Sequence, residues 1–403
     1  MVAASLISLT GDWILQVGLV YEVYALTRST LASALLMLAA ILPQLLLGSL
    51  AGVLADRWDR RRTMMAANGL MALLLLPLIA IHSPQTIWIA YPVAFAESII
   101  QQFFSPAEQA LFPTLVDDAQ LVSANAVNGQ SQNAARLLGS ALGGVAVAAG
   151  GIPLVTAADA VSFVVAAWLV ARLAAPARER PRPATGVAAR LAALRREWVE
   201  GLRLTRQSRV LAALAAFIVV TGVGEGDMGA LFAPFVRHVL HGSGSAYGLI
   251  LSAQAVGGIV GGLVAAAVAG RGAPLRLFGW GAVAFGAIDL AIFLYPLEYV
   301  AIWPAVAGMV IVGLPGALTM AAMMTLYQQQ TPDAYRGRVW GAFSTLAGLG
   351  VGLGTVGAGL VAQQTGIIPV IAFQGVGYLG AGIAMVALLR PPVSAARSTP
   401  APG

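Results

Sequence analysis

The stretch from Gly52 to Arg62 reads GVLADRWDRRR and separates two long apolar segments of the chain. It combines a glycine, two aspartates and four arginines within eleven positions. A charged side chain placed in hydrocarbon costs ~2.5–3.5 kcal/mol on insertion scales, so charge in such a chain collects where water is. The stretch is therefore predicted to be a tight turn at one surface of a membrane.

The composition places the whole chain in the membrane. Its 403 residues are 59% hydrophobic and 10% charged, with a mean hydropathy of +0.82, whereas soluble proteins are roughly 25% charged. A spanning helix needs about 20 predominantly apolar residues, and about twelve such segments occur. The predicted spans lie near 3–26, 31–55, 63–81, 86–110, 124–149, 152–174, 209–234, 246–270, 275–296, 299–327, 338–364 and 367–390.

The arginines give a prediction of topology. All 23 basic residues are arginine, and 20 of them fall in segments on one side of the predicted spans. Arg28 and Arg237 lie on the other side, and Arg136 lies inside a span. Because cytoplasmic segments of membrane proteins are enriched in basic residues, both termini are predicted to be cytoplasmic. The net charge of +6 then reflects topology and attraction to anionic headgroups, and no basic face on a soluble domain indicates nucleic-acid binding.

Several classes of protein are excluded. There is no cysteine, and His82, His238 and His241 show no metal-ligand spacing. Residues 352–357 fit the dinucleotide pattern G-x-G-x-x-G, but they lie inside an apolar span with no strand before them, which indicates helix packing instead. No nucleophile–base pair and no phosphate-binding loop is visible. We expect no enzyme activity, no cofactor, no metal site and no ATP-driven transport.

A polar segment divides the spans into two sets of six. The predicted units are an N-terminal bundle (1–174), a basic linker (175–208), a C-terminal bundle (209–390) and a tail (391–403). The linker contains an amphipathic helix on the cytoplasmic surface or a solvated segment with some helicity, and the sequence favours neither. Its helically spaced apolar residues are Leu191, Leu194, Trp198 and Leu202.

The two halves repeat one pattern. Asp118-Ala119 leads into a polar-faced span, and Asp333-Ala334 does the same in the second half. Internal repeats are common in secondary transporters, with the binding site at the repeat interface near the midplane. The first span begins almost at once, which favours a start site assigned too far downstream over a cleaved signal peptide.

Short motifs along the full length carry a family resemblance. They are Gly11-Asp12, Gly52–Arg57, Ser105-Pro106-Ala107, Phe112-Pro113, Ala124-Asn125-Ala126, Arg136–Gly139, Thr331-Pro332-Asp333 and Arg336–Val339. In these the chain resembles the major facilitator superfamily, above all its bacterial efflux branch of enterobactin-exporter-like and macrolide-efflux-like proteins. It departs from the superfamily patterns at Asp59, where glycine is usual, and at Ser140, where drug/proton antiporters have proline.

The resemblance implies a fold and a function. The expected fold is an all-α membrane protein with about 12 transmembrane helices in two six-helix bundles. The expected protein is a monomer in the bacterial cytoplasmic membrane that exports a small drug-, macrolide- or siderophore-like molecule by proton antiport. A proton-coupled importer is the first alternative, and a non-transporting sensor or scaffold is a remote one.

For the loop, the resemblance implies a conformational gate made of Gly52, Asp56, Arg57, Arg60 and Arg61. Asp56 would contact the N-terminal end of the eleventh span near Trp340 and Gly341, where the helix dipole favours a negative charge, and the arginines would bind neighbouring acids. The alternative is a simple stop-transfer anchor, which accounts for the arginines alone.

Ionisable residues inside predicted spans are candidates for proton coupling, because they are costly there. They are Asp12, Glu97, Arg136, Asp159, Glu225, Asp227 and Asp289.

A carboxylic acid in a low-dielectric cavity holds its proton more tightly than in water, so it can exchange protons near physiological pH. We rank Asp12 first and Glu97 second. Arg136 is expected to neutralise one of them, and the alternative is a permanent structural ion pair.

The remaining acids rank lower. Glu225 and Asp227 lie in a glycine-rich stretch that indicates either a broken helix at a transport site or a position at the outer surface. Asp159 and Asp289 are weaker candidates, because either could be close to the outer headgroups.

Amide side chains are candidates for substrate binding, and helix packing is the alternative role for each of them. The substrate-binding candidates are Gln101, Gln102, Asn128, Gln132 and Gln254.

Overall fold

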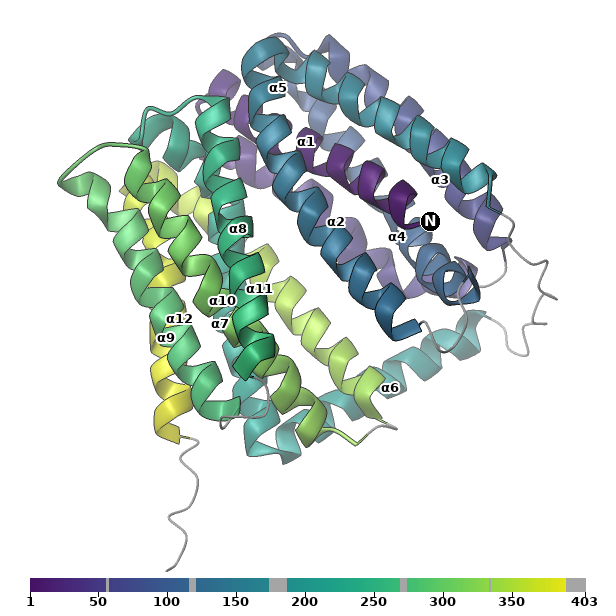
Figure 1. Ribbon diagram of the computed structural model, residues 1–403, viewed down its shortest axis with the longest axis vertical. Coiled ribbons are helices and arrows are strands. Elements are labelled where there is room, and N and C mark those ends of the chain that lie inside the picture. The colour runs from purple at the N-terminus through teal and green to yellow at the C-terminus, as the bar shows by residue number, and fades with distance from the viewer. Residues whose placement is uncertain (56–57, 116–120, 174–186, 269–273, 333–334, 389–403) are drawn as a thin grey trace, which may run out of the picture.

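The computed structural model describes residues 1–403 with the exception of 56–57, 116–120, 174–186, 269–273, 333–334 and 389–403. The described residues form helices joined by short connections, and no strand occurs among them. Figure 1 shows the N-terminal helices, purple to blue, beside the C-terminal helices, green to yellow.

The first half of the chain supplies one bundle. Its elements are α1 (Val2–Thr27), α2 (Thr30–Ala55), α3 (Arg60–Leu75), η1 (Leu76–Ala80), η2 (Pro84–Ile89), α4 (Ala90–Leu111), η3 (Phe112–Leu115) and α5 (Leu121–Ala171).

Helix α5 is two spanning limbs in one continuous element. Its 51 residues at ~1.5 Å each would be far longer than the ~30 Å hydrocarbon core. The chain turns at Gly151, where φ is 59° and ψ is −154°, a conformation that glycine adopts without a steric penalty. Pro153 follows in the first turn of the second limb. The limbs correspond to the separate spans predicted near 124–149 and 152–174.

The second half supplies the other bundle and the helix that precedes it. Its elements are α6 (Val187–Gln207), α7 (Arg209–Pro234), the π-helical turn η5 (Phe235–Val239), α8 (Gly244–Val268), α9 (Pro274–Leu294), η6 (Tyr295–Leu297), α10 (Trp303–Gln330), α11 (Arg336–Thr365) and α12 (Ile367–Leu388).

Among the described residues, nine helices are long and apolar enough to cross a membrane, and Thr30–Gln44 is a shorter apolar helix. One of the nine, Val127–Ala171, contains both limbs of α5. The prediction of an all-α membrane protein is therefore confirmed. The cytoplasmic side of the termini stays a prediction.

Helix α6 defines one end of the molecule, which we call the linker end. It packs against α11 and α7 and runs along the lower edge of Figure 1. At Gly201 a Cβ atom would lie 2.2 Å from the carbonyl oxygen of Arg338, so only glycine allows this approach to the start of α11. The opposite end, where α1 finishes and α8 begins, is the far end.

The two bundles are joined mainly by α5 against α8 and by α2 against α11. At the α5–α8 contact a Cβ atom on Gly248 would lie 2.3 Å from the carbonyl oxygen of Ser140. Small residues let the backbones of two membrane helices come this close, which gives the van der Waals contact that holds such helices together.

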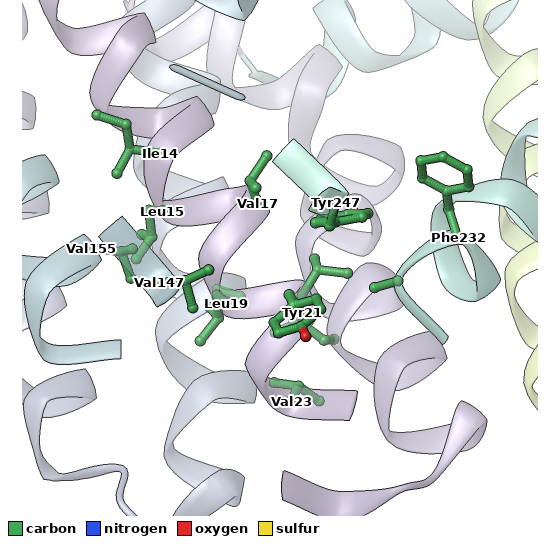
Figure 2. Close-up of a cluster of buried hydrophobic side chains, with 14 of the residues drawn as sticks. Ile14, Leu15, Val17, Leu19, Tyr21, Val23, Val147, Val155, Phe232 and Tyr247 are labelled. Carbon is green, nitrogen blue, oxygen red and sulfur yellow. The ribbon is translucent and has the colours of Figure 1, made fainter. Parts of the chain in front are cut away.

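Side-chain contacts between the bundles gather toward the far end in the described part of the chain. Tyr21 on α1 donates to the carbonyl oxygen of Gly242 (3.0 Å), and its ring stacks on that of Tyr247 with centroids 6.0 Å apart. Figure 2 shows this apolar cluster, with residues of α1, α5 and the C-terminal bundle together. Thr30 donates to the carbonyl oxygen of Gly359 (3.1 Å).

The linker end is built differently. There the C-terminal bundle has a hydrophobic core of its own, which includes Leu214, Phe278, Val339 and Phe343. The other core is shared between both bundles. The bundles are therefore packed together at the far end, whereas toward the linker end the C-terminal bundle packs on itself.

Candidate functional site

Three acidic side chains from three helices meet inside the N-terminal bundle. Asp12 of α1, Glu97 of α4 and Asp159 of α5 each direct one carboxylate oxygen so that these atoms lie within 4.8 Å of one another. We call this group the acidic cluster. Asp159 is fully buried, with 0% of its surface exposed, and the other two are partly buried.

A glycine makes the acidic cluster possible. A Cβ atom on Gly11 would lie 2.1 Å from Ser162 Oγ and 2.3 Å from Asp159 Oδ1. Because Gly11 has no side chain, α1 and the second limb of α5 approach closely, and Asp12 is carried to the same junction. Ser162 donates a hydrogen bond to Asp159 Oδ1 (3.0 Å).

The cluster has unused hydrogen-bonding capacity. Asp12 Oδ1 and Asp159 Oδ2 are buried and have no hydrogen-bond partner among the residues that the structure describes. Carboxylate oxygens bind protons and hard cations, and repulsion among like charges at this spacing favours the uptake of either. The cluster can therefore hold a proton or a cation.

The structure corrects the ranking of the acids. Asp159 was a weaker candidate because a position close to the outer headgroups was open, but it lies beside the two leading candidates because the chain folds back at Gly151. Glu108, which was not singled out, accepts a hydrogen bond from Ser5. It lies eleven residues after Glu97, which is three helical turns, so this spacing places both acids on one face of α4.

Arg136 does not pair with the acids expected. Within the described residues no ion pair joins it to Asp12 or Glu97; its guanidinium donates to Gln254 Oε1 and lies 5.5 Å from the centroid of the Trp13 ring. The contact with Gln254 joins α5 to α8 and so crosses between the bundles. The expected neutralising role is corrected to a bridging one in this conformation.

Glu225 lies on α7 in the C-terminal bundle and is exposed. Its Oε1 accepts hydrogen bonds from the Tyr378 hydroxyl (2.8 Å) and from Gln374 Nε2 (3.2 Å). Asp227, two residues on, is buried. The helix is continuous here, so the broken helix considered for this stretch is not formed.

The glycines around Glu225 serve packing. A Cβ atom on Gly226 would lie 2.1 Å from the carbonyl oxygen of Val351 on α11, and one on Gly224 would lie 2.7 Å from Cα of Gln374 on α12. Close packing against α11 and α12 thus accounts for the glycine pattern and brings Gln374 to Glu225.

A cavity of about 490 Å³ adjoins Glu225 within the C-terminal bundle, lined by residues of α7, α9, α10, α11 and α12. A larger cavity of about 890 Å³ lies at the far end, where Arg28 and His238 are among its lining residues. The larger one contains none of the candidate residues, whereas the smaller one contains Glu225.

The predicted gate falls partly outside the described residues. Asp56 and Arg57 lie outside them, as do the surroundings of Gly52. Arg61 was expected to bind an acid, but its Nε donates to the carbonyl oxygen of Val170 (3.2 Å) at the end of α5. Arg60 is half-buried at the start of α3.

The amide candidates are not brought to one place by their hydrogen bonds. Gln102 donates to the carbonyl oxygen of Ser98 in its own helix (3.2 Å), and Gln101 beside it is half-buried. Asn128 is half-buried and Gln132 is exposed on α5. The one remaining candidate, Gln254, is the partner of Arg136.

Two helical bundles from one chain, packed together at one end, are the architecture of transporters of the major facilitator fold. The chain belongs to the transmembrane secretion effector family of the major facilitator superfamily, whose sequence profile matches residues 1–402. The family resemblance drawn from the motifs is thereby confirmed, and the protein is a multi-pass membrane transporter.

Three bacterial transporters align with this chain along nearly their whole length. The MFS-type transporter YfiS of Bacillus subtilis (strain 168) is 28% identical over 98% of this chain and 94% of its own. Macrolide efflux protein A of Streptococcus pyogenes is 24% identical, and the alignment covers 91% of this chain and 89% of that protein. The staphyloferrin A transporter of Staphylococcus aureus (strain NCTC 8325 / PS 47) is 22% identical, and the alignment covers 93% of this chain and 91% of that protein.

Solved structures show the same fold. A bacterial homologue of the iron transporter ferroportin, in an inward-facing state, superposes with a TM-score of 0.77 at 15% identity. The superposition covers 96% of this chain and 97% of that one.

Proposed function

We propose that this protein is a proton-driven exporter that exchanges protons for a small amphipathic molecule across the bacterial cytoplasmic membrane. The observation that supports this most strongly is the acidic cluster of Asp12, Glu97 and Asp159. A proton antiporter needs a group that is protonated in one orientation and deprotonated in the other. Carboxylates that repel one another while buried supply such a group.

The arrangement of the bundles suggests how the exchange is made. The N-terminal unit (1–174) and the C-terminal unit (209–390) rock against each other about their shared interface, as repeat-built transporters do. With the linker end on the cytoplasmic side, as the arginines predict, the far end, where the bundles are packed together, faces outward. One chain supplies both bundles, so a monomer is sufficient for this cycle.

The names of the relatives suggest the cargo. One relative is named for macrolide efflux and another for staphyloferrin A transport. We propose a cargo of this size range with both apolar and polar parts, exported from the cytoplasm.

The test is transport by the purified protein in proteoliposomes with an imposed pH gradient, with a radiolabelled macrolide as the first probe. A panel of fluorescent drugs, macrolides and siderophores, assayed in a pump-deficient strain, widens the choice of cargo. Inverted vesicles from the same strain give the direction, because an exporter accumulates cargo inside them.

Removal of the cluster's charges should uncouple transport from the gradient. Asp12→Asn, Glu97→Gln and Asp159→Asn are each expected to reduce gradient-driven transport to the rate seen without a gradient. Glu298→Gln, which removes an exposed carboxylate just after η6, is the matched control and should transport normally. Full gradient-driven transport by both the Asp12 and Glu97 variants would show that coupling lies elsewhere.

A further inference from the structure

The cavity beside Glu225 has an aromatic wall. The Tyr378 ring lies 4.3 Å from that of Phe285 and 5.7 Å from that of Phe217, measured between centroids, and all three residues line the cavity. Trp340, with 40% of its surface exposed, lines it as well. A cation above an aromatic face is attracted by the ring quadrupole, most strongly by that of tryptophan.

Flexible methionine side chains form another part of the cavity wall. Met320, Met323 and Met324 lie on one stretch of α10 and all line the cavity. Methionine is unbranched and polarisable, and it is frequent at surfaces that accept ligands of varied shape. A volume of about 490 Å³ is within the range of pockets that hold drug-sized molecules.

Glu225 is the only charged side chain among the described residues that line this cavity. Both partners of its carboxylate, Tyr378 and Gln374, are neutral. Arg136 interacts electrostatically with Glu225, but the Arg136 guanidinium is hydrogen-bonded to Gln254. The cavity thus presents a negative charge that is oriented by two donors and is not matched by a cation in its own wall.

We propose that this cavity binds the cargo and that the cargo is an amphipathic organic cation. Its positive group would lie at the Glu225 carboxylate and its apolar body against the rings and methionines. This inference rests on the proposed transport function and adds the chemical class of the ligand. It also assigns Glu225, until now a coupling candidate, to ligand binding.

Other ligands fit the cavity less well. An organic anion would be repelled by Glu225, since no arginine or histidine is among the lining residues. A metal ion needs several oxygen, nitrogen or sulfur donors, and one carboxylate in an apolar wall does not provide them. A neutral apolar molecule would gain no attraction from the Glu225 carboxylate, whose two hydrogen-bond partners are neutral.

The test is equilibrium binding of radiolabelled tetraphenylphosphonium to the full chain, purified in detergent. Binding needs neither a pH gradient nor an intact coupling site. Glu225→Gln removes the charge with little change in shape, and Glu225→Asp keeps the charge. Glu298→Gln is the matched control, because it removes an exposed carboxylate that does not line the cavity.

We expect wild type, Glu225→Asp and the control to bind the phosphonium, and Glu225→Gln to bind it at least about tenfold more weakly. Triphenylphosphine oxide, a neutral analogue, should compete at least about tenfold less well than unlabelled phosphonium. This comparison uses the wild type alone, so it stands even where a variant fails to fold.

Three results would overturn the proposal: no binding to wild type, equal competition by the neutral analogue, or undiminished binding by a folded Glu225→Gln. The proposed function fails separately. Phosphonium binding without gradient-driven transport would refute the antiporter and leave the ligand site standing. Macrolide transport that survives in Glu225→Gln would refute the site and leave the antiporter standing.

Discussion

At the scale of the residue, the position of a charged group in this protein depends on a small neighbour. Asp12 reaches Asp159 because Gly11 allows two helices to approach until a Cβ atom would overlap Ser162. In the other bundle Gly224 allows the backbone at Gln374 close to α7, and the Gln374 side chain donates to Glu225. The acids determine the chemistry, and the glycines determine where the acids meet.

Gly11→Ala should therefore destabilise the protein and separate the acidic cluster. The added methyl group would lie 2.1 Å from Ser162 Oγ, and overpacking of this kind costs about 1–3 kcal/mol. The measurement is the midpoint of thermal unfolding in detergent, which should fall. The matched control is Gly69→Ala on α3, where nothing lies within 4 Å of the added atom and the midpoint should hold or rise slightly. Equal midpoints for the two variants would refute the packing argument.

Single residues also show how much of the candidate site could be predicted from the sequence alone. Asp12 and Glu97 could be selected because an acid in the middle of an apolar span is costly and therefore informative. Asp159 was ranked below them because it lies only a few residues from a predicted loop. The sequence does not show that the chain turns at Gly151 and carries Asp159 back beside Asp12 and Glu97. The partner of Arg136 is a neutral amide on another bundle, and no pattern within α5 specifies which residue of α8 will face it.

At the scale of the element, the predicted spans correspond to the helices found, because the length and apolarity of a span can be read from one segment of sequence. Prediction was weaker for features that depend on contacts with other helices. The glycines around Glu225 suggested a broken helix, but α7 is continuous and uses them against α11 and α12. Glycine permits both outcomes, so only the neighbouring helix distinguishes them.

The linker helix α6 gives a prediction about element packing. It meets the start of α11 through a backbone approach at Gly201 and through an ion pair between Glu200 and Arg338 (3.0 Å). The ion pair is solvent-exposed and is worth about 0–1 kcal/mol, whereas a side chain at Gly201 has no space. Gly201→Val should therefore lower the unfolding midpoint clearly, and Glu200→Gln should change it little.

The unfolding midpoints of the two variants and of wild type, measured under the same conditions, test whether Gly201→Val has the larger effect. The α6 contact also predicts that Gly201→Val raises the rate of limited proteolysis between the bundles, because α6 would be displaced from α11. A larger effect of Glu200→Gln than of Gly201→Val would show that charge, and not backbone approach, holds α6 in place.

At the scale of the whole molecule, the two bundles are packed together at the far end, and the C-terminal bundle has a core of its own at the linker end. Besides the shared apolar cluster, the far-end contacts include hydrogen bonds to backbone carbonyls and helix approaches at glycines, as at Tyr21 and Gly248. This arrangement suits a joint that opens and closes while each bundle keeps its own packing.

A cross-link at the far end should stop the transport cycle if the bundles must separate there. The chain has no cysteine, so any disulfide formed in a double-cysteine variant must join the two introduced cysteines. A Cβ atom on Gly244 of α8 would lie 2.3 Å from Val147 Cγ1 of α5, which is close enough for a disulfide in Val147→Cys/Gly244→Cys. Oxidation should reduce transport to background, and a reductant should restore it.

The matched control joins two helices of one bundle. A Cβ atom on Gly18 of α1 would lie 2.6 Å from Val155 Cγ1 of α5, so Gly18→Cys/Val155→Cys replaces the same two residue types at a similar spacing. Both of its cysteines lie in the N-terminal bundle, so if that bundle moves as a unit this disulfide should leave transport unchanged. Transport at the wild-type rate by the oxidised Val147→Cys/Gly244→Cys protein would mean that the far end stays closed throughout the cycle. Alternating access by rocking of the two bundles would then be wrong for this protein.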